Sequence, residues 1–138
     1  MGEYLKIHKA GGVLVRNRRA LVVRSAKDHE HFLTPGGKIE LAETIIEALH
    51  RELNEELGIN FDDQDAAPIG TFSGILDTRP GEIKMEVFLI KNWVGEPVAS
   101  HEIAELKWVN SVDVNQIKTG TIFKEQILPW LKKQNLID

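Results

Sequence analysis

Cysteine is absent from the 138 residues of this chain. Disulfides, zinc sites with thiolate ligands and a cysteine nucleophile are therefore excluded. Long apolar runs are also missing, since Gly12–Val15 and Val87–Ile90 are far too short to span a bilayer. The N-terminus lacks the apolar region of a secretory signal. We therefore expect a cytoplasmic protein with no membrane partner.

Positive charge is scarce as well. The formal net charge is −4, and no long basic run occurs. Binding to nucleic acid depends on Lys and Arg contacts to phosphates, so we do not expect nucleic acid as the main partner. An acidic protein can still bind phosphates when metal ions supply the positive charge. The length fits one domain, which we expect to cover residues 1–138.

Local patterns predict a mixed α/β protein. Two short β-branched runs, Val13–Val15 and Leu21–Val23, flank the polar Asn17–Arg19 and indicate a hairpin. Pro35-Gly36-Gly37 is expected to end the strand before it. Further strands are expected at Phe32–Thr34, Ile69–Ile75, Glu82–Trp93 and Glu105–Val109, and a helix interrupted by Pro129 at Thr121–Gln134.

The segment from Glu43 to Leu57 is the strongest helix in the sequence. It is rich in Leu, Glu and Ala and contains neither Gly nor Pro. One buried face is predicted by apolar residues that recur at helical spacing, namely Ile46, Leu49, Leu53 and Leu57. Gly58 follows at the position where glycine commonly ends a helix.

Three carboxylates lie close together on this helix. At about 100° per residue, Glu55 and Glu56 fall about 60° and 40° to either side of Glu52, along the edge of the apolar face. Such a strip is either a solvated acidic face or a cation site. Oxygen-only ligands of this kind suit Mg²⁺ or Mn²⁺.

The spacing of the surrounding residues favours the cation site. Gly37 is followed after five residues by Glu43, and seven further residues lead to Arg51-Glu52-Leu53. Glu55-Glu56 and Gly58-Ile59 complete the pattern. A chance match at one starting point has a probability on the order of 10⁻⁹ at average residue frequencies.

This pattern resembles the Nudix box, and the chain is similar to the MutT-like members of the Nudix hydrolase family. The resemblance implies an α/β/α sandwich with a mixed β-sheet, in which the box forms a loop–helix–loop. It also implies that Glu55 and Glu56 are catalytic Mg²⁺ ligands, with Mn²⁺ as a substitute, and that Glu52 is a further catalytic ligand or the base. The backbone of Gly37 is implied as a further ligand. Glu43 and Arg51 are implied to brace the loop against the helix.

Other site residues follow from the same resemblance. A glutamate in a later loop is implied to join the catalytic metal site, and Glu102 lies nearest that place, with Glu105 as its competitor. Arg24 stands where MutT-like proteins place a substrate-contacting arginine. The remaining candidate substrate contacts are Lys38 for a phosphate and Phe32 and Phe123 for a base.

The implied reaction is hydrolysis of a diphosphate linkage in a nucleotide-type small molecule. The first candidate is a nucleoside triphosphate, oxidised forms included, giving the monophosphate and pyrophosphate. ADP-ribose, a nucleotide sugar and a dinucleoside polyphosphate remain alternatives, because Gly120–Lys124 lacks the asparagine that MutT-like enzymes use to read guanine. A silent nucleotide-binding regulatory domain is a further alternative, although every box glutamate is present.

Overall fold

The computed structural model describes residues 3–27, 30–76 and 79–138, in which most of the elements are strands. The strands are β1 (Leu5–Val13), β2 (Val15–Arg16), β3 (Arg19–Ser25), β4 (His31–Leu33), β5 (Gly36–Lys38), β6 (Ala66–Ile75), β7 (Gly81–Ile90), β8 (Ile103–Val109) and β9 (Lys118–Thr119). The α-helices are α1 (Ile45–Leu57) and α2 (Leu128–Lys133). Short 3₁₀ turns occur at Asp63–Asp65 and Asp113–Gln116.

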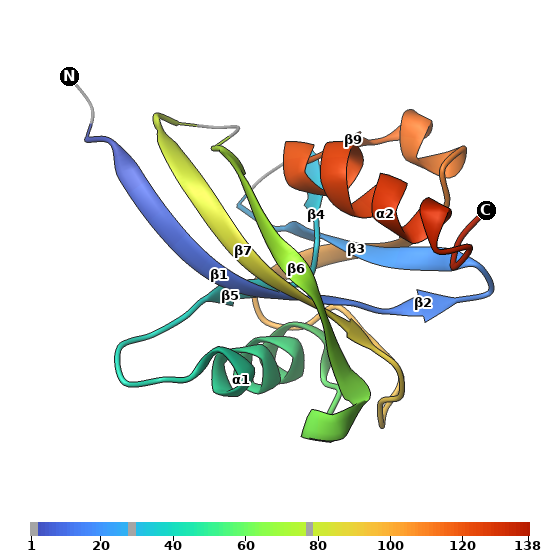
Figure 1. Ribbon diagram of the computed structural model, residues 1–138, viewed down its shortest axis with the longest axis horizontal. Helices are drawn as coiled ribbons and strands as arrows, with labels where there is room; N and C mark the ends of the chain where they lie inside the picture. The colour runs from blue at the N-terminus through green and yellow to red at the C-terminus, as the bar shows by residue number, and fades with distance from the viewer. Residues whose placement is uncertain (1–2, 28–29, 77–78) are drawn as a thin grey trace.

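The elements form a layered sandwich. Within the described residues, one sheet has the strand order β5-β1-β7-β6, and the other has the order β2-β3-β4-β9 with β8 beside β3. The strands β1 and β7 run parallel, whereas β6 and β7 run antiparallel, so the first sheet is mixed. α1 and α2 lie on opposite sides of the strands (Figure 1). The expected α/β/α sandwich is therefore confirmed.

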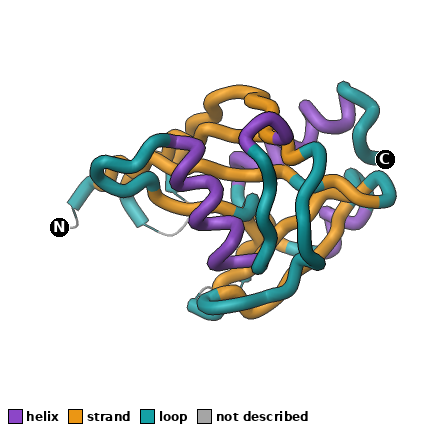
Figure 2. The backbone as a smooth tube through the Cα atoms, turned by 90° about the horizontal axis from the view of Figure 1, so that it is seen from below, coloured by secondary structure: helices purple, strands orange, loops and turns teal. Residues whose placement is uncertain are grey.

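The helix α1 begins two residues later than the pattern predicts, because Thr44 caps it. The Thr44 hydroxyl accepts from the Glu47 backbone N–H, and the Glu47 carboxylate accepts from the Thr44 N–H. Leu49, Leu53 and Leu57 are fully buried against the first sheet, as their spacing predicts. Figure 2 shows α1 lying across the strands, with loops beside it.

The N-terminal strands explain how the box is attached to the sheet. β2 and β3 form the expected hairpin, with Asn17 and Arg18 at positive φ in its turn. The strand β4 ends at Leu33, before Pro35, as predicted, but the two glycines do not remain in a turn. Gly36–Lys38 is itself the strand β5, which pairs antiparallel with β1. This pairing fixes the start of the box at the edge of the first sheet.

The C-terminal helical segment contains the expected interruption. Pro129 lies in the first turn of α2, and the five residues Phe123–Ile127 immediately before α2 form a π-helical turn. Because proline has no N–H to donate, a local change in helical winding accommodates it. The segment nevertheless buries Ile127 and Leu131 in the hydrophobic core that also contains Phe32 and Val87. No helix in the described parts of the chain is long and apolar enough to cross a membrane.

Candidate active site

Glu52 packs directly on the glycine that opens the box. A Cβ atom placed on Gly37 would lie 2.3 Å from Cδ of Glu52 and 2.5 Å from either carboxylate oxygen. No side chain larger than hydrogen fits there without moving Glu52. Glu52 also accepts a hydrogen bond from Nη1 of Arg51 at 2.8 Å. The strand β5 and the helix α1 therefore hold this carboxylate from two sides.

Glu56, one helical turn further, reaches the same strand. Its Oε1 atom accepts a hydrogen bond of 2.8 Å from the Gly36 N–H. Burial raises the pKa of Glu56 to about 8, and the charges of Glu52 and Glu55 act in the same direction. The Gly36 N–H and the charge of Lys9 oppose this rise. Without a bound cation, Glu56 is therefore mostly protonated at neutral pH.

Arg51 connects the loop to the helix. Its guanidinium donates to both carboxylate oxygens of Glu43, at 2.7 and 2.9 Å, and to the carbonyl of Lys38 at 3.0 Å. These hydrogen bonds hold the pKa of Glu43 at about 2, well below its usual range. Glu43 also accepts from the Glu40 N–H. The contacts are those expected of residues that brace the box.

The carboxylates suit a divalent cation in their chemistry. Glu52, Glu55 and Glu56 supply oxygen donors only, which Mg²⁺ and Mn²⁺ prefer. Among the described residues, however, no three acidic or histidine side chains converge closely enough to form a ready-made metal site. Glu52 is turned toward Arg51, and the Glu55 side chain is 49% exposed. The residues fit the ion, and binding it would require Glu52 and Glu55 to rotate.

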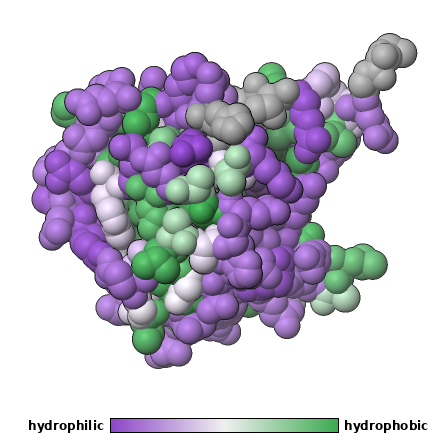
Figure 3. Space-filling view, turned by 180° about the vertical axis from the view of Figure 1, so that it is seen from behind, coloured by the Kyte–Doolittle hydropathy of each residue, from purple (hydrophilic) through white to green (hydrophobic). Residues whose placement is uncertain are grey.

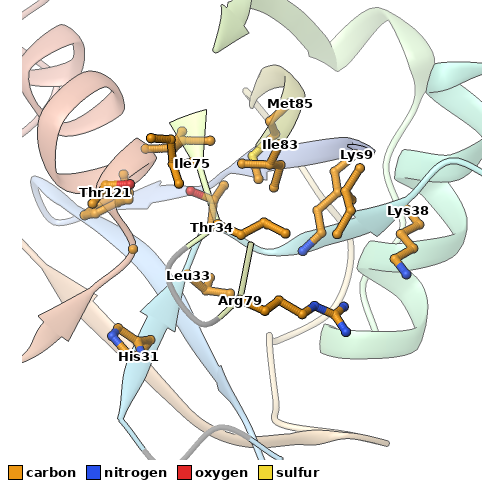
Figure 4. Close-up of a pocket in the computed structure, with 15 residues that line it drawn as sticks. Lys9, His31, Leu33, Thr34, Lys38, Ile75, Arg79, Ile83, Met85 and Thr121 are labelled. Atoms are coloured by element: carbon orange, nitrogen blue, oxygen red, sulfur yellow. The ribbon is translucent and has the colours of Figure 1, made fainter. Parts of the chain in front are cut away.

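A cleft of about 210 Å³ adjoins β5, the strand that Glu52 and Glu56 contact. Its walls are mainly apolar and come from β1, β4, β7 and the segment before α2. Figure 4 shows the hydroxyls of Thr34 and Thr121 turned toward one another across the cleft. Lys9, Lys38 and Arg79 lie on its other side. The cleft and the carboxylates meet at β5, because Lys38 follows Gly37 directly.

The structure separates the four expected substrate contacts. Lys38 and Phe123 line the cleft, although Phe123 is only 2% exposed and forms part of its wall. Phe32 is 5% exposed, belongs to the core and does not line the cleft, so its expected role in stacking on a base is corrected. Arg24 lies above the Phe32 ring and pairs with Glu105 at 3.3 Å. It does not line the cleft either.

The two candidate loop glutamates lie in different places. Glu102 is 70% exposed and pairs with Lys27 at 3.2 Å. The loop before it is attached to the end of α1, because the Ser100 N–H and hydroxyl donate to the carbonyls of Glu56 and Glu55. Glu105 lies on β8, and its carboxylate forms an ion pair with Arg24. In this conformation neither carboxylate belongs to the strip on α1.

Two cations that line the cleft were missed by the reasoning from sequence, namely Lys9 and Arg79. Lys9 shares the face of β1 with Ile7 and Val13, and Val13 is buried in the core. The alternation of this strand was therefore a usable signal that Lys9 points inward. Arg79 lies two residues before β7, and nothing in the sequence around it indicates the cleft.

Comparisons with known proteins agree with this geometry. The family model described as NUDIX domain matches residues 6–131. An 8-oxo-dGTP diphosphatase from Buchnera aphidicola subsp. Acyrthosiphon pisum (strain APS) is 34% identical over 125 residues, which are 90% of this chain and 95% of that protein.

Solved structures share the fold. A MutT Nudix hydrolase from Burkholderia pseudomallei superimposes with a TM-score of 0.74 at 23% identity, covering 94% of this chain and 98% of that one. A MutT protein from Methanosarcina mazei Go1 superimposes with a TM-score of 0.77 at 20% identity, covering 98% of this chain and 99% of that one. From the box, the fold and these relatives together, the chain belongs to the Nudix hydrolase family.

Proposed function

We propose that this protein is a Mg²⁺-dependent pyrophosphohydrolase that converts a nucleoside triphosphate to the monophosphate and pyrophosphate. The observation that carries the proposal is the carboxylate strip of Glu52, Glu55 and Glu56, which lies against Gly36 and Gly37 at the mouth of an apolar cleft. The 34% identical relative named 8-oxo-dGTP diphosphatase supports the same reaction.

The size of the cleft supports a nucleotide that is bound by one end. Pockets that enclose a whole small ligand usually measure roughly 300–1,000 Å³, whereas this cleft measures about 210 Å³. A purine or pyrimidine base fits its apolar walls, and the phosphates then remain at the mouth, beside α1. This orientation brings the diphosphate linkage to Glu52 and Glu56 rather than to the core.

Each box residue has a defined part in the reaction. Glu52, Glu55 and Glu56 would hold the divalent ion. Position 37 requires glycine, because the Glu52 carboxylate occupies the space that a larger side chain would need. An ion held there would neutralise phosphate charge and lower the pKa of a bound water. One of the ionised box carboxylates would accept the proton of the attacking water. Arg51 and Glu43 keep the strip in position.

The polar groups of the cleft bear on base selectivity. Thr34 and Thr121 present hydroxyls, and a hydroxyl can either donate or accept a hydrogen bond. An asparagine amide discriminates between base edges more strictly, and Gly120–Lys124 contains none. We therefore propose that triphosphates of more than one base are substrates, rather than an oxidised purine alone.

We propose that residues 1–138 form one Nudix domain, which acts in the cytoplasm on small nucleotides and not on nucleic acid. The NUDIX model matches residues 6–131, and the net charge of −4 disfavours a nucleic-acid partner.

The test is a panel of substrates assayed with Mg²⁺ and with Mn²⁺. The panel contains common and oxidised nucleoside triphosphates, ADP-ribose, a nucleotide sugar and a dinucleoside polyphosphate, and product identity is read by chromatography. We expect triphosphates to give monophosphate and pyrophosphate. Glu56→Gln should reduce kcat by a factor of at least 100, whereas Glu125→Gln, at an exposed position away from the strip, should not. No turnover of any compound would refute the proposal.

A further inference from the structure

Three cations surround the mouth of the cleft, and they come from separate parts of the chain. Lys9 lies on β1, Lys38 on β5, and Arg79 just before β7. The pairing of β1 with β5 places Lys9 directly opposite Lys38. Figure 4 shows the three side chains extending toward the same open side of the cleft. Seen from behind, the surface is hollowed below the N-terminal end of β1 and bordered mainly by hydrophilic residues (Figure 3).

None of these three cations forms an ion pair within 4.0 Å in the described residues, and Glu52 and Glu56 act on Lys9 only at longer range. The ion pairs over residues 3–27, 30–76 and 79–138 involve other lysines and arginines, such as Lys84 with Glu86 and Arg16 with Glu96. Cations that converge without partners repel one another. In a chain with a net charge of −4, this local excess of positive charge marks a place for an anion.

Lys9 is the most unusual of the three because it is partly buried. Burial lowers its pKa, and the charges of Lys38 and Arg79 act in the same direction. The charges of Glu56 and Glu52 act to raise it, so Lys9 lies within electrostatic reach of both the strip and the other two cations. A lysine held in this way can interact with a phosphate that spans the distance from the carboxylate strip to Arg79.

We propose that Lys9, Lys38 and Arg79 form an anion subsite for the terminal phosphate of the substrate, and that this subsite selects nucleotides whose last phosphate is free. The inference rests on the proposed function of the adjoining site. A free terminal phosphate carries close to two negative charges at neutral pH, as a phosphomonoester does. A phosphate capped by a second sugar carries one. The three cations therefore interact more strongly with a triphosphate than with a diphosphate capped at both ends.

Kinetics on matched substrates test the selection. Lys9→Met and Arg79→Gln should each raise KM for a nucleoside triphosphate about tenfold, the loss expected for one charge-assisted hydrogen bond. They should change KM for a capped substrate, such as a nucleotide sugar, less than threefold, with kcat altered less than KM. Lys132→Met, on the exposed end of α2, should leave both substrates unaffected. Equal changes of KM for free and capped substrates would overturn the inference.

A binding measurement separates this inference from the proposed function. Inorganic tripolyphosphate is titrated into metal-free protein by calorimetry, at low and at moderate salt. We expect binding that weakens with salt and falls at least tenfold in Lys9→Met and Arg79→Gln but not in Lys132→Met. This result would support the subsite even if no nucleotide of the panel were hydrolysed. Undiminished binding by both variants would overturn the subsite even if triphosphates were hydrolysed.

Discussion

Replacing Glu56 by glutamine should stabilise the metal-free protein in alkaline solution while abolishing its activity. The folded protein holds the pKa of Glu56 at about 8, against an ordinary value of 4.5. Between these two values the folded state binds more protons than the unfolded state, so stability falls as pH rises through this window. Glutamine carries no charge to bury, and its carbonyl can still accept from the Gly36 N–H.

The magnitude follows from the two pKa values. Each pKa unit corresponds to 1.36 kcal/mol, so the full difference represents at most about 5 kcal/mol. Glu56 is only partly buried, and solvent reduces this to on the order of 2 kcal/mol. For a chain of this size we therefore expect Glu56→Gln to raise Tm by roughly 5–10 °C at pH 8. Near pH 5 the difference should be close to zero.

Thermal unfolding in the absence of divalent ions provides the assay. Wild type, Glu56→Gln and the exposed control Glu125→Gln are compared at pH 5, 6.5 and 8. Saturating Mg²⁺ should then stabilise the wild type at pH 8 but stabilise Glu56→Gln much less, because one ligand is neutral. An equal loss of Tm in Glu56→Gln at pH 5 and pH 8 would refute the reasoning, since it would show a structural role without a buried charge.

Three further results are expected. Gly37→Ala should lower kcat at least tenfold with Tm within a few degrees of wild type, because the added Cβ displaces the Glu52 carboxylate; steady-state kinetics and unfolding check this. Stability that depends on Glu43 should be present above about pH 4.5 and be lost as pH falls toward about 2, and acid titration of Glu43→Gln should show a smaller loss over this range. Leu53→Ala should cost about 2–5 kcal/mol in denaturant unfolding, because Leu53 is fully buried between α1 and the first sheet.

Local sequence patterns correctly predicted the helix that carries the box glutamates and the N-terminal hairpin. The apolar spacing through Leu49, Leu53 and Leu57 predicts α1 and its buried face, and Gly58 ends it in the left-handed conformation. The hairpin of β2 and β3 was likewise predicted from two short apolar runs that flank polar residues. These features depend on residues within one or two turns of one another, and short-range periodicity and capping therefore determine them.

Some errors arose where pairing partners are distant in sequence. Gly36–Lys38 reads as a turn, yet the exposed edge of β1, more than 20 residues earlier, pairs with it and makes it a strand. Phe32 is expected to stack on a base, yet it is buried in the hydrophobic core that contains Ile127 and Leu131. In each case a neighbour far along the chain overrides the local preference.

The sequence by itself determined the family, the helix that carries Glu52, Glu55 and Glu56, and the class of reaction these residues imply. Helix geometry alone fixes how these three side chains lie relative to one another, whatever α1 packs against. Only the tertiary structure decided what surrounds them. The pairing of β1 with β5 brings Lys9 near Glu56 and Lys38, although Glu56 lies 47 positions after Lys9 in the chain. Burial and charge at the cleft are sums over such distant neighbours, and no local pattern records them.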